Sequence, residues 1–105
     1  MAHLDVFRNP DATTAGVIPY VVDVQSELLS GLPTHVVIPL AYPEAIETRP
    51  ILRLNPKVGV GDTALVVLTQ DLAAVPSRLL RNPVANLSSQ RDEILAALDF
   101  LFTGF

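Results

Sequence analysis

The segment SSQRDEILAALDFLFTGF, residues 88–105, is the strongest helix signal in the sequence, because its apolar residues return to one face at helical spacing. That face consists of Ile94, Leu98, Leu101 and Phe105, with Phe102 beside it. Ser88 or Ser89 is predicted to cap the helix, and two acidic residues in its first turn suit the helix dipole. Gly104 is predicted to end it, since glycine adopts the left-handed conformation at little cost.

The sequence before this helix is divided by nine prolines, which end helices and interrupt sheets, so short strands are predicted there. The predicted strands cover residues 3–7, 20–25, 35–40, 51–54 and 64–68, with turns at 30–33 and 60–63 and one helical turn within 42–48. Pro39 is expected to place its strand at an edge or a bend, because proline has no N–H to donate. The pattern predicts a single domain, residues 1–105, that is mainly β (α+β) with a C-terminal helix.

Two of these strands show how the domain is expected to bury its apolar residues. In residues 20–25, one face carries Tyr20, Val22 and Val24, and the other carries Val21, Asp23 and Gln25. Residues 64–68 are apolar throughout, which is typical of a strand covered on both faces. The second cover comes either from a helix of the same chain or from a second subunit, and both alternatives stay open at this level.

Composition excludes several classes of protein. Eleven acidic residues against seven basic ones give a net charge of −4 over 105 residues, which disfavours direct nucleic-acid binding. The absence of cysteine excludes disulfides and thiolate metal sites, and His3 and His35 are too few for a histidine-rich zinc site. No metal or cofactor is therefore expected. No signal peptide or membrane-spanning stretch is visible, so we expect a cytoplasmic protein without membrane contact.

The sequence contains no catalytic motif, which predicts that the protein is not an enzyme. Residues 59–61 lack the third glycine and the following helix of a phosphate-binding loop. His35 lies in an apolar strand and is expected to be hydrogen-bonded within the fold or placed at an edge, rather than catalytic. Asp23 is equally compatible with a solvated strand face and with a structural hydrogen bond.

Two apolar features indicate contact with a protein partner. Residues 101–105 hold two aromatic side chains where chain ends are usually polar, and the alternative is that they pack into the core. Leu28 and Leu29 form an apolar pair just before the turn at 30–33, and core packing is again the alternative.

Six short blocks, in this order and at this spacing, closely resemble the CcdB family, the toxins of toxin–antitoxin pairs that poison DNA gyrase. The blocks are VDVQS (22–26), VIPL (37–40), LTQD (68–71), AVP (74–76), NLS (86–88) and FTGF (102–105). The resemblance implies an SH3-like small antiparallel β-barrel, with a five-stranded sheet, a small extra sheet and a long C-terminal helix. It also implies a homodimer that binds the DNA gyrase A subunit and traps the gyrase–DNA cleavage complex without chemistry of its own.

The family's gyrase-binding positions transfer to this sequence residue by residue. They fall on Leu28, Leu29, Asp99, Phe102, Thr103, Gly104 and Phe105. Gly104 matches the family, and Thr103 matches the members that lack a tryptophan at this position. Phe105 departs from the usual isoleucine, although it is also apolar. The missing tryptophan removes a stacking platform worth about 1–3 kcal/mol at a binding hot spot.

The resemblance further implies a CcdA-like antitoxin, whose disordered C-terminal segment wraps the toxin and whose DNA-binding domain represses the operon. Operator DNA is therefore met only through the antitoxin. Because a disordered partner brings acidic residues to local positive charge, its predicted contacts are among Arg8, Arg49, Arg53 and Arg78.

Two other functions fit the same fold class. One is a MazF-like endoribonuclease toxin, whose general base and cations are to be sought among Asp23, His35, Arg8 and Arg53. The other is a family member that still binds an antitoxin but no longer poisons gyrase.

Overall fold

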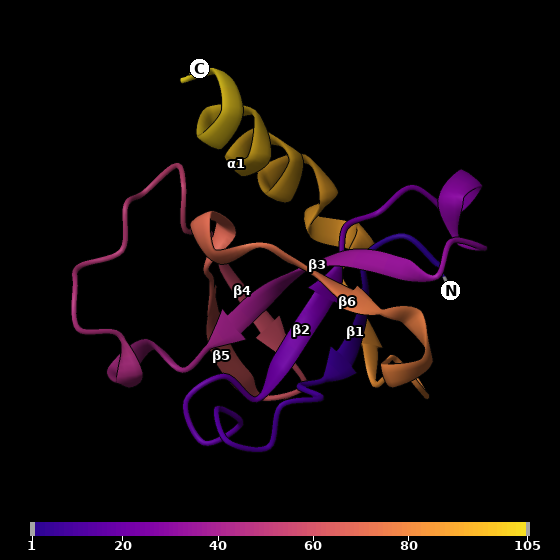
Figure 1. Ribbon diagram of the computed structural model, residues 1–105. Helices are drawn as coiled ribbons and strands as arrows, with labels where there is room; N and C mark the ends of the chain where they lie inside the picture. Colours follow the sequence, from indigo (N-terminus) through magenta and orange to yellow (C-terminus); the bar gives the residue numbers. More distant parts are fainter. Residues whose placement is uncertain (1, 105) are drawn as a thin grey trace.

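Seven short strands form one antiparallel sheet in the computed structural model, which describes residues 2–104 (Figure 1). The strands are β1 (Asp5–Arg8), β2 (Tyr20–Asp23), β3 (Thr34–Ala41), β4 (Lys57–Val60), β5 (Thr63–Val67), β6 (Ala73–Pro76) and β7 (Ala85–Asn86). Their order is β4-β5-β3-β2-β1-β7, and β6 pairs with β3 outside this path. With helix α1 (Arg91–Thr103), they make a nearly closed small barrel of the α+β type. The predicted fold class is confirmed, but the implied extra sheet is part of the same sheet.

The long strand β3 is central, and Pro39 lies where it changes partner. Its first half, Thr34–Val37, pairs with β6, whereas Leu40 and Ala41 pair with β5. The Pro39 carbonyl accepts a hydrogen bond from Leu68 at 2.9 Å, on the side of β3 that faces these two strands. The missing N–H of proline therefore falls at the gap between two partners, where no ladder donor is required. Of the two expected placements, the edge is wrong, because β3 pairs with β2 on one side and with β5 and β6 on the other.

The barrel interior is filled by the apolar faces that the strand alternation predicts. Val22 lies in the main cluster, whereas Val21 on the opposite face packs with Phe7, Val37 and Leu80. The main cluster consists of Leu4, Val6, Val22, Ile38, Leu40, Val58, Val60, Leu65, Val67, Leu87 and Ile94. Leu65–Val67 are fully buried within the one chain. The cover on both faces of this strand is thus supplied without a second subunit.

The predicted strand at residues 51–54 is wrong. This segment forms a turn that Asn55 holds, because its side chain accepts from the N–H of Ile51 at 3.0 Å and donates to the carbonyl of Val67 at 3.0 Å. The strand follows instead at Lys57–Val60, and the predicted tight turn joins it to β5 with Gly61 at φ +60°. That left-handed conformation favours glycine.

Helix α1 starts later than predicted, and no serine caps it. Ser88 and Ser89 belong to a short 3₁₀ turn, Ser88–Gln90, and Gln90 at the N-cap makes no side-chain capping bond. The amide oxygen of Asn86 instead accepts from the Ser88 N–H at 2.8 Å. The predicted end is confirmed, because Gly104 adopts φ +80° and its N–H donates to the Phe100 carbonyl at 2.9 Å.

Strand β1 also starts two residues after the predicted position. Leu4 has a φ of +69°, which is incompatible with a continuous strand, and β1 begins at Asp5.

The loop that follows β1 is held by local bonds to Asp11. The hydroxyl and the backbone N–H of Thr13 both donate to its carboxylate, and they hold the pKa of Asp11 below its ordinary value.

Candidate functional site

The C-terminal half of α1 carries the first candidate surface and projects beyond the barrel (Figure 1). Only Ile94 and Ala97 of this helix are buried. Phe102 is 70% exposed, so the alternative of core packing is wrong for this residue. Asp99 and Thr103 are exposed beside it, and the Thr103 hydroxyl donates to the Asp99 carbonyl at 2.6 Å.

The end of this helix places the remaining tip residues. Gly104 is exposed and its left-handed conformation redirects the chain after the last helical turn. Phe105 lies outside the described residues. The predicted gyrase-binding residues of the helix, as far as the structure describes them, therefore occupy one exposed end.

The second candidate surface is the η1 turn, which we define as residues 26–33 around the short 3₁₀ helix η1 (Glu27–Leu29). Leu28 is 94% exposed and Leu29 is 49% exposed, so the alternative of core packing is wrong here as well. Figure 1 shows this turn, in purple, on the side of the N-terminus, away from the projecting end of α1. Within one chain, the structure does not bring the leucine pair together with the tip.

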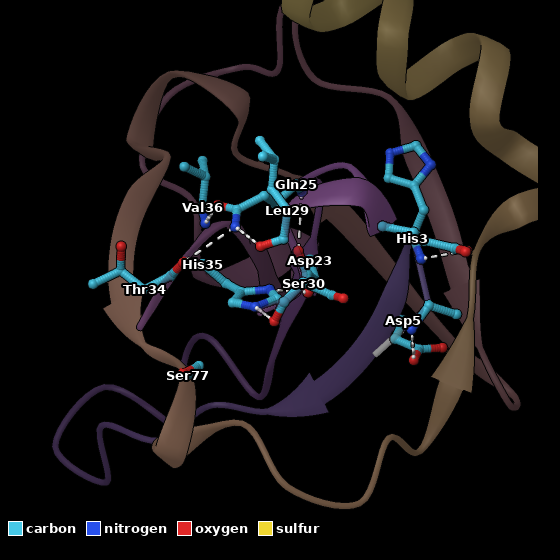
Figure 2. A network of polar contacts seen from close by, with 12 residues as sticks. His3, Asp5, Asp23, Gln25, Leu29, Ser30, Thr34, His35, Val36 and Ser77 are labelled. Carbon is cyan, nitrogen blue, oxygen red and sulfur yellow. Dashed lines mark hydrogen bonds and ion pairs between the residues drawn. The ribbon is translucent and has the colours of Figure 1, made fainter. Parts of the chain in front are cut away.

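Beneath the η1 turn lies a buried polar network that joins β2, β3 and the turn (Figure 2). His35 Nδ1 lies 2.7 Å from a carboxylate oxygen of Asp23, and His35 Nε2 lies 3.0 Å from the Ser30 carbonyl oxygen. Both side chains are almost fully buried. Asp23 also accepts from the Gln25 N–H at 2.9 Å. Of the two readings of Asp23, the structure supports the structural hydrogen bond, and His35 is satisfied within the fold as predicted.

A groove of about 590 Å³ runs between residues 49–57 and helix α1. It gathers three of the seven basic residues, Arg49, Arg53 and Lys57, on this acidic chain, with Glu93 of the helix on its lining. The Arg53 guanidinium stacks over the Phe100 ring, 4.7 Å from its centroid. The lining residues are Arg49, Pro50, Leu52, Arg53, Asn55, Pro56, Lys57, Glu93 and Ala96.

Two of the four arginines that were predicted as antitoxin contacts line this groove. It brings Arg49 and Arg53 together, whereas Arg8 ends β1 and Arg78 lies in the 3₁₀ turn Ser77–Leu79, both outside the groove lining. Sequence reasoning missed Lys57, although it is the only lysine of the chain and lies four residues from Arg53.

Residues 2–104 contain neither a cluster of potential metal ligands nor a membrane-spanning helix. Among residues 2–104, no three His, Asp or Glu side chains are placed to hold a metal ion. The one long helix there has neither the length nor the continuous apolar character needed to span a membrane.

A protein-family model described as CcdB protein matches residues 3–104 of the 105 residues. The match extends from the start of the barrel to the end of α1, and thus includes both candidate surfaces and the groove.

Proposed function

The chain belongs to the CcdB family, and on this premise we propose that it is the toxin of a type II toxin–antitoxin pair, which binds the DNA gyrase A subunit and traps the gyrase–DNA cleavage complex. The observation that carries the proposal is the 70% exposure of Phe102 on a helix end that projects from the barrel. An aromatic side chain exposed at a rigid position is typical of a binding hot spot.

The way the helix holds its end favours tight binding. Residues 91–103 are already helical, so the aromatic side chain and the residues beside it lose little freedom when they bind. We therefore infer an inhibitor that acts by insertion and contact, without chemistry of its own. Gyrase and its DNA are cytoplasmic, so the proposal also places the protein there.

The ribonuclease alternative lacks an assembled site. Asp23 and His35 are paired with each other and buried, whereas a general base must reach the RNA. Arg8 and Arg53 are exposed and belong to different parts of the fold, the end of β1 and the groove. The geometry thus favours gyrase poisoning over RNA cleavage.

A single pair of incubations tests this function. With gyrase, ATP and supercoiled DNA, the protein is expected to accumulate linear DNA after denaturation, because the trapped enzyme holds both strands cut. With RNA of mixed sequence, no cleavage is expected. Linear DNA in the first incubation supports the proposal, and cleaved RNA in the second supports the MazF-like alternative. A folded protein that does neither, and still binds a CcdA-like antitoxin, is the third alternative.

We further propose that the chain is a homodimer, as the family resemblance implies. The buried β5 strand no longer argues for a second subunit, since Leu65–Val67 are covered within one chain. The support comes from α1, where Leu95, Leu98 and Leu101 are only half-buried. A second copy is the partner that covers such a helix face in a two-fold dimer.

Sedimentation at micromolar concentration is expected to report twice the mass of one chain, because the apolar helix face is removed from water in the dimer. Dilution should reveal the monomer at a concentration set by the dissociation constant. A sedimenting species of single-chain mass across the micromolar range contradicts the dimer.

A further inference from the structure

The groove between residues 49–57 and helix α1 carries charges of both signs on opposite walls. Arg49, Arg53 and Lys57 line the wall formed by residues 49–57, which we call the basic wall, and Glu93 lines the wall formed by α1. Within residues 2–104, none of these four side chains belongs to an ion pair. All four residues are exposed, so their charges are available to a ligand in the groove.

The basic wall is anchored to the barrel by buried polar groups. The Asn55 side-chain amide donates to the Val67 carbonyl at 3.0 Å and to the side-chain oxygen of Gln70 at 2.8 Å. The Thr69 hydroxyl donates to the Leu54 carbonyl at 2.6 Å. Both donor residues are buried, so these bonds are shielded from water. The cations of the basic wall therefore project from a backbone that is fixed before any ligand binds.

The two walls are joined at both ends of the groove. At one end, the Gln90 side-chain amide donates to the Lys57 carbonyl at 3.0 Å. At the other end, the Arg53 guanidinium lies 4.7 Å from the centroid of the Phe100 ring. Glu93 follows Gln90 by three residues and precedes Phe100 by seven, so all three share one side of α1. Glu93 thus lies between the two contacts and faces the groove, beside the loop that joins β3 to β4 (Figure 1).

The dimensions of the groove fit a peptide segment better than a single small anion. The helix rises about 15 Å between Gln90 and Phe100, at 1.5 Å per residue. An extended chain rises about 3.3 Å per residue, so roughly five residues fit along the groove. Leu52, which is 91% exposed, and Ala96 add apolar contact surface to the lining.

We infer that the groove binds an extended peptide segment of mixed charge, with acidic side chains on the basic wall and one basic side chain on Glu93. The Phe100 ring covers a face of the Arg53 guanidinium and leaves its N–H groups for a carboxylate. Glu93 is the specificity residue, because it repels a purely acidic segment and attracts one with a cation at the matching position. That the segment belongs to a CcdA-like antitoxin rests on the proposed function.

Glu93→Gln and Asp92→Asn form a matched pair of variants. Each removes one negative charge from the first turn of α1, so both lose the same kind of interaction with the helix dipole. The Asp92 side chain is fully exposed and is not part of the groove lining. A difference in peptide binding between the two variants therefore reports the charge inside the groove.

Acetylated hexaglutamate, titrated into ¹⁵N-labelled protein, is the first probe. Its binding is expected to shift the backbone resonances of residues 49–57 and 93–96. Glu93→Gln should bind it about threefold more tightly than the native protein, since a like charge has been removed, whereas Asp92→Asn should bind it as the native protein does. Shifts confined to other parts of the chain, or equal affinities for all three proteins, overturn the inference.

Hexapeptides in which lysine replaces one glutamate at each position in turn test the mixed-charge pattern. Lysine at one position is expected to give about threefold tighter binding to the native protein than lysine at the remaining positions, because only there does it meet Glu93. This preference should vanish in Glu93→Gln and persist in Asp92→Asn. If the native protein shows no preferred position, or if the preference survives without Glu93, the inference is overturned.

The C-terminal peptide of the antitoxin is the last probe. Its affinity is expected to fall about threefold in Glu93→Gln and to stay unchanged in Asp92→Asn. If the hexapeptides behave as expected and the antitoxin peptide does not respond to Glu93→Gln, the antitoxin is not the occupant and that assignment is overturned. If the protein neither traps gyrase nor binds the antitoxin, the proposed function fails, and the hexapeptides still decide the charge pattern of the groove.

Discussion

Deletion of Thr103–Phe105 is expected to abolish the trapping of gyrase on DNA while the shortened chain remains folded. The described residues that are removed are exposed, and the bonds lost with them include the Thr103 hydroxyl to the Asp99 carbonyl and the Gly104 N–H to the Phe100 carbonyl. The free energy of unfolding should therefore change by no more than about 1 kcal/mol. Linear DNA in the gyrase assay and thermal unfolding, measured on the same preparation, check the two halves of this expectation.

Gly104→Ala tests the direction of the tip without shortening it. A methyl group at Gly104 has no neighbour within 4 Å, but φ is +80°, where alanine is strained. The chain is expected to leave the helix along a different path, and trapping should weaken. Gly16→Ala is the matched control, because Gly16 also has open space around it and its φ lies outside the strained range.

The deletion variant also shows whether the tip residues contact gyrase or pack into the core. An unfolded deletion variant means that the removed residues belong to the core, and the tip assignment is then wrong. A folded deletion variant that still traps gyrase shows that the family's gyrase contacts do not transfer to these positions.

The sequence predicts the barrel and its helix well, because hydrophobic periodicity decides where those elements lie. Residues 20–25 alternate and α1 repeats at helical spacing, so both appear near their predicted places. Two of the errors lie beside a side-chain amide that bonds the backbone, whereas the late start of β1 reflects the positive φ of Leu4. Asn55 folds the β-prone residues 51–54 into a turn, and Asn86 accepts from the Ser88 N–H at the start of the 3₁₀ turn that precedes α1.

Some residues of the candidate site could likewise be predicted from the sequence, and others could not. The family resemblance marks Phe102, Leu28 and Leu29 one residue at a time, so the sequence alone could single them out. The contact between Asp23 and His35 could not be predicted in this way, because the two residues are separated by 12 positions and meet only through the register of β2 on β3. The sequence left two alternatives open for Asp23 and two for His35. Only the strand register shows that the two side chains are hydrogen-bonded to each other.

Reversing the charges of Arg49 and Arg53 is expected to lower antitoxin affinity by roughly two orders of magnitude. The proposal behind it is that the acidic segment of a CcdA-like antitoxin lies in the groove between residues 49–57 and α1, which gathers three basic residues. Close charge pairs across interfaces contribute about 1.5 kcal/mol or more each, and reversal replaces attraction by repulsion. Calorimetric titration of Arg49→Glu/Arg53→Glu with the antitoxin's C-terminal peptide measures the change.

Arg8→Glu/Arg78→Glu is the matched control for this experiment. It changes the net charge of the chain by the same amount, but both residues lie outside the groove lining. If antitoxin binding depends only on the net charge of the chain, both double variants lose the same amount of antitoxin affinity, and the groove assignment is wrong. If it binds the groove, the control should alter mainly the association rate and its dependence on salt.

Stability must be followed alongside, because Arg53 also contributes to the fold. Its stacking over Phe100 at 4.7 Å is worth about 0.5–1 kcal/mol at an exposed position, and Arg53→Glu loses it. Arg53→Gln/Arg49→Gln loses the same stacking without adding negative charge. A graded loss of antitoxin affinity, larger for the glutamate pair than for the glutamine pair at equal stability, assigns the effect to charge recognition in the groove.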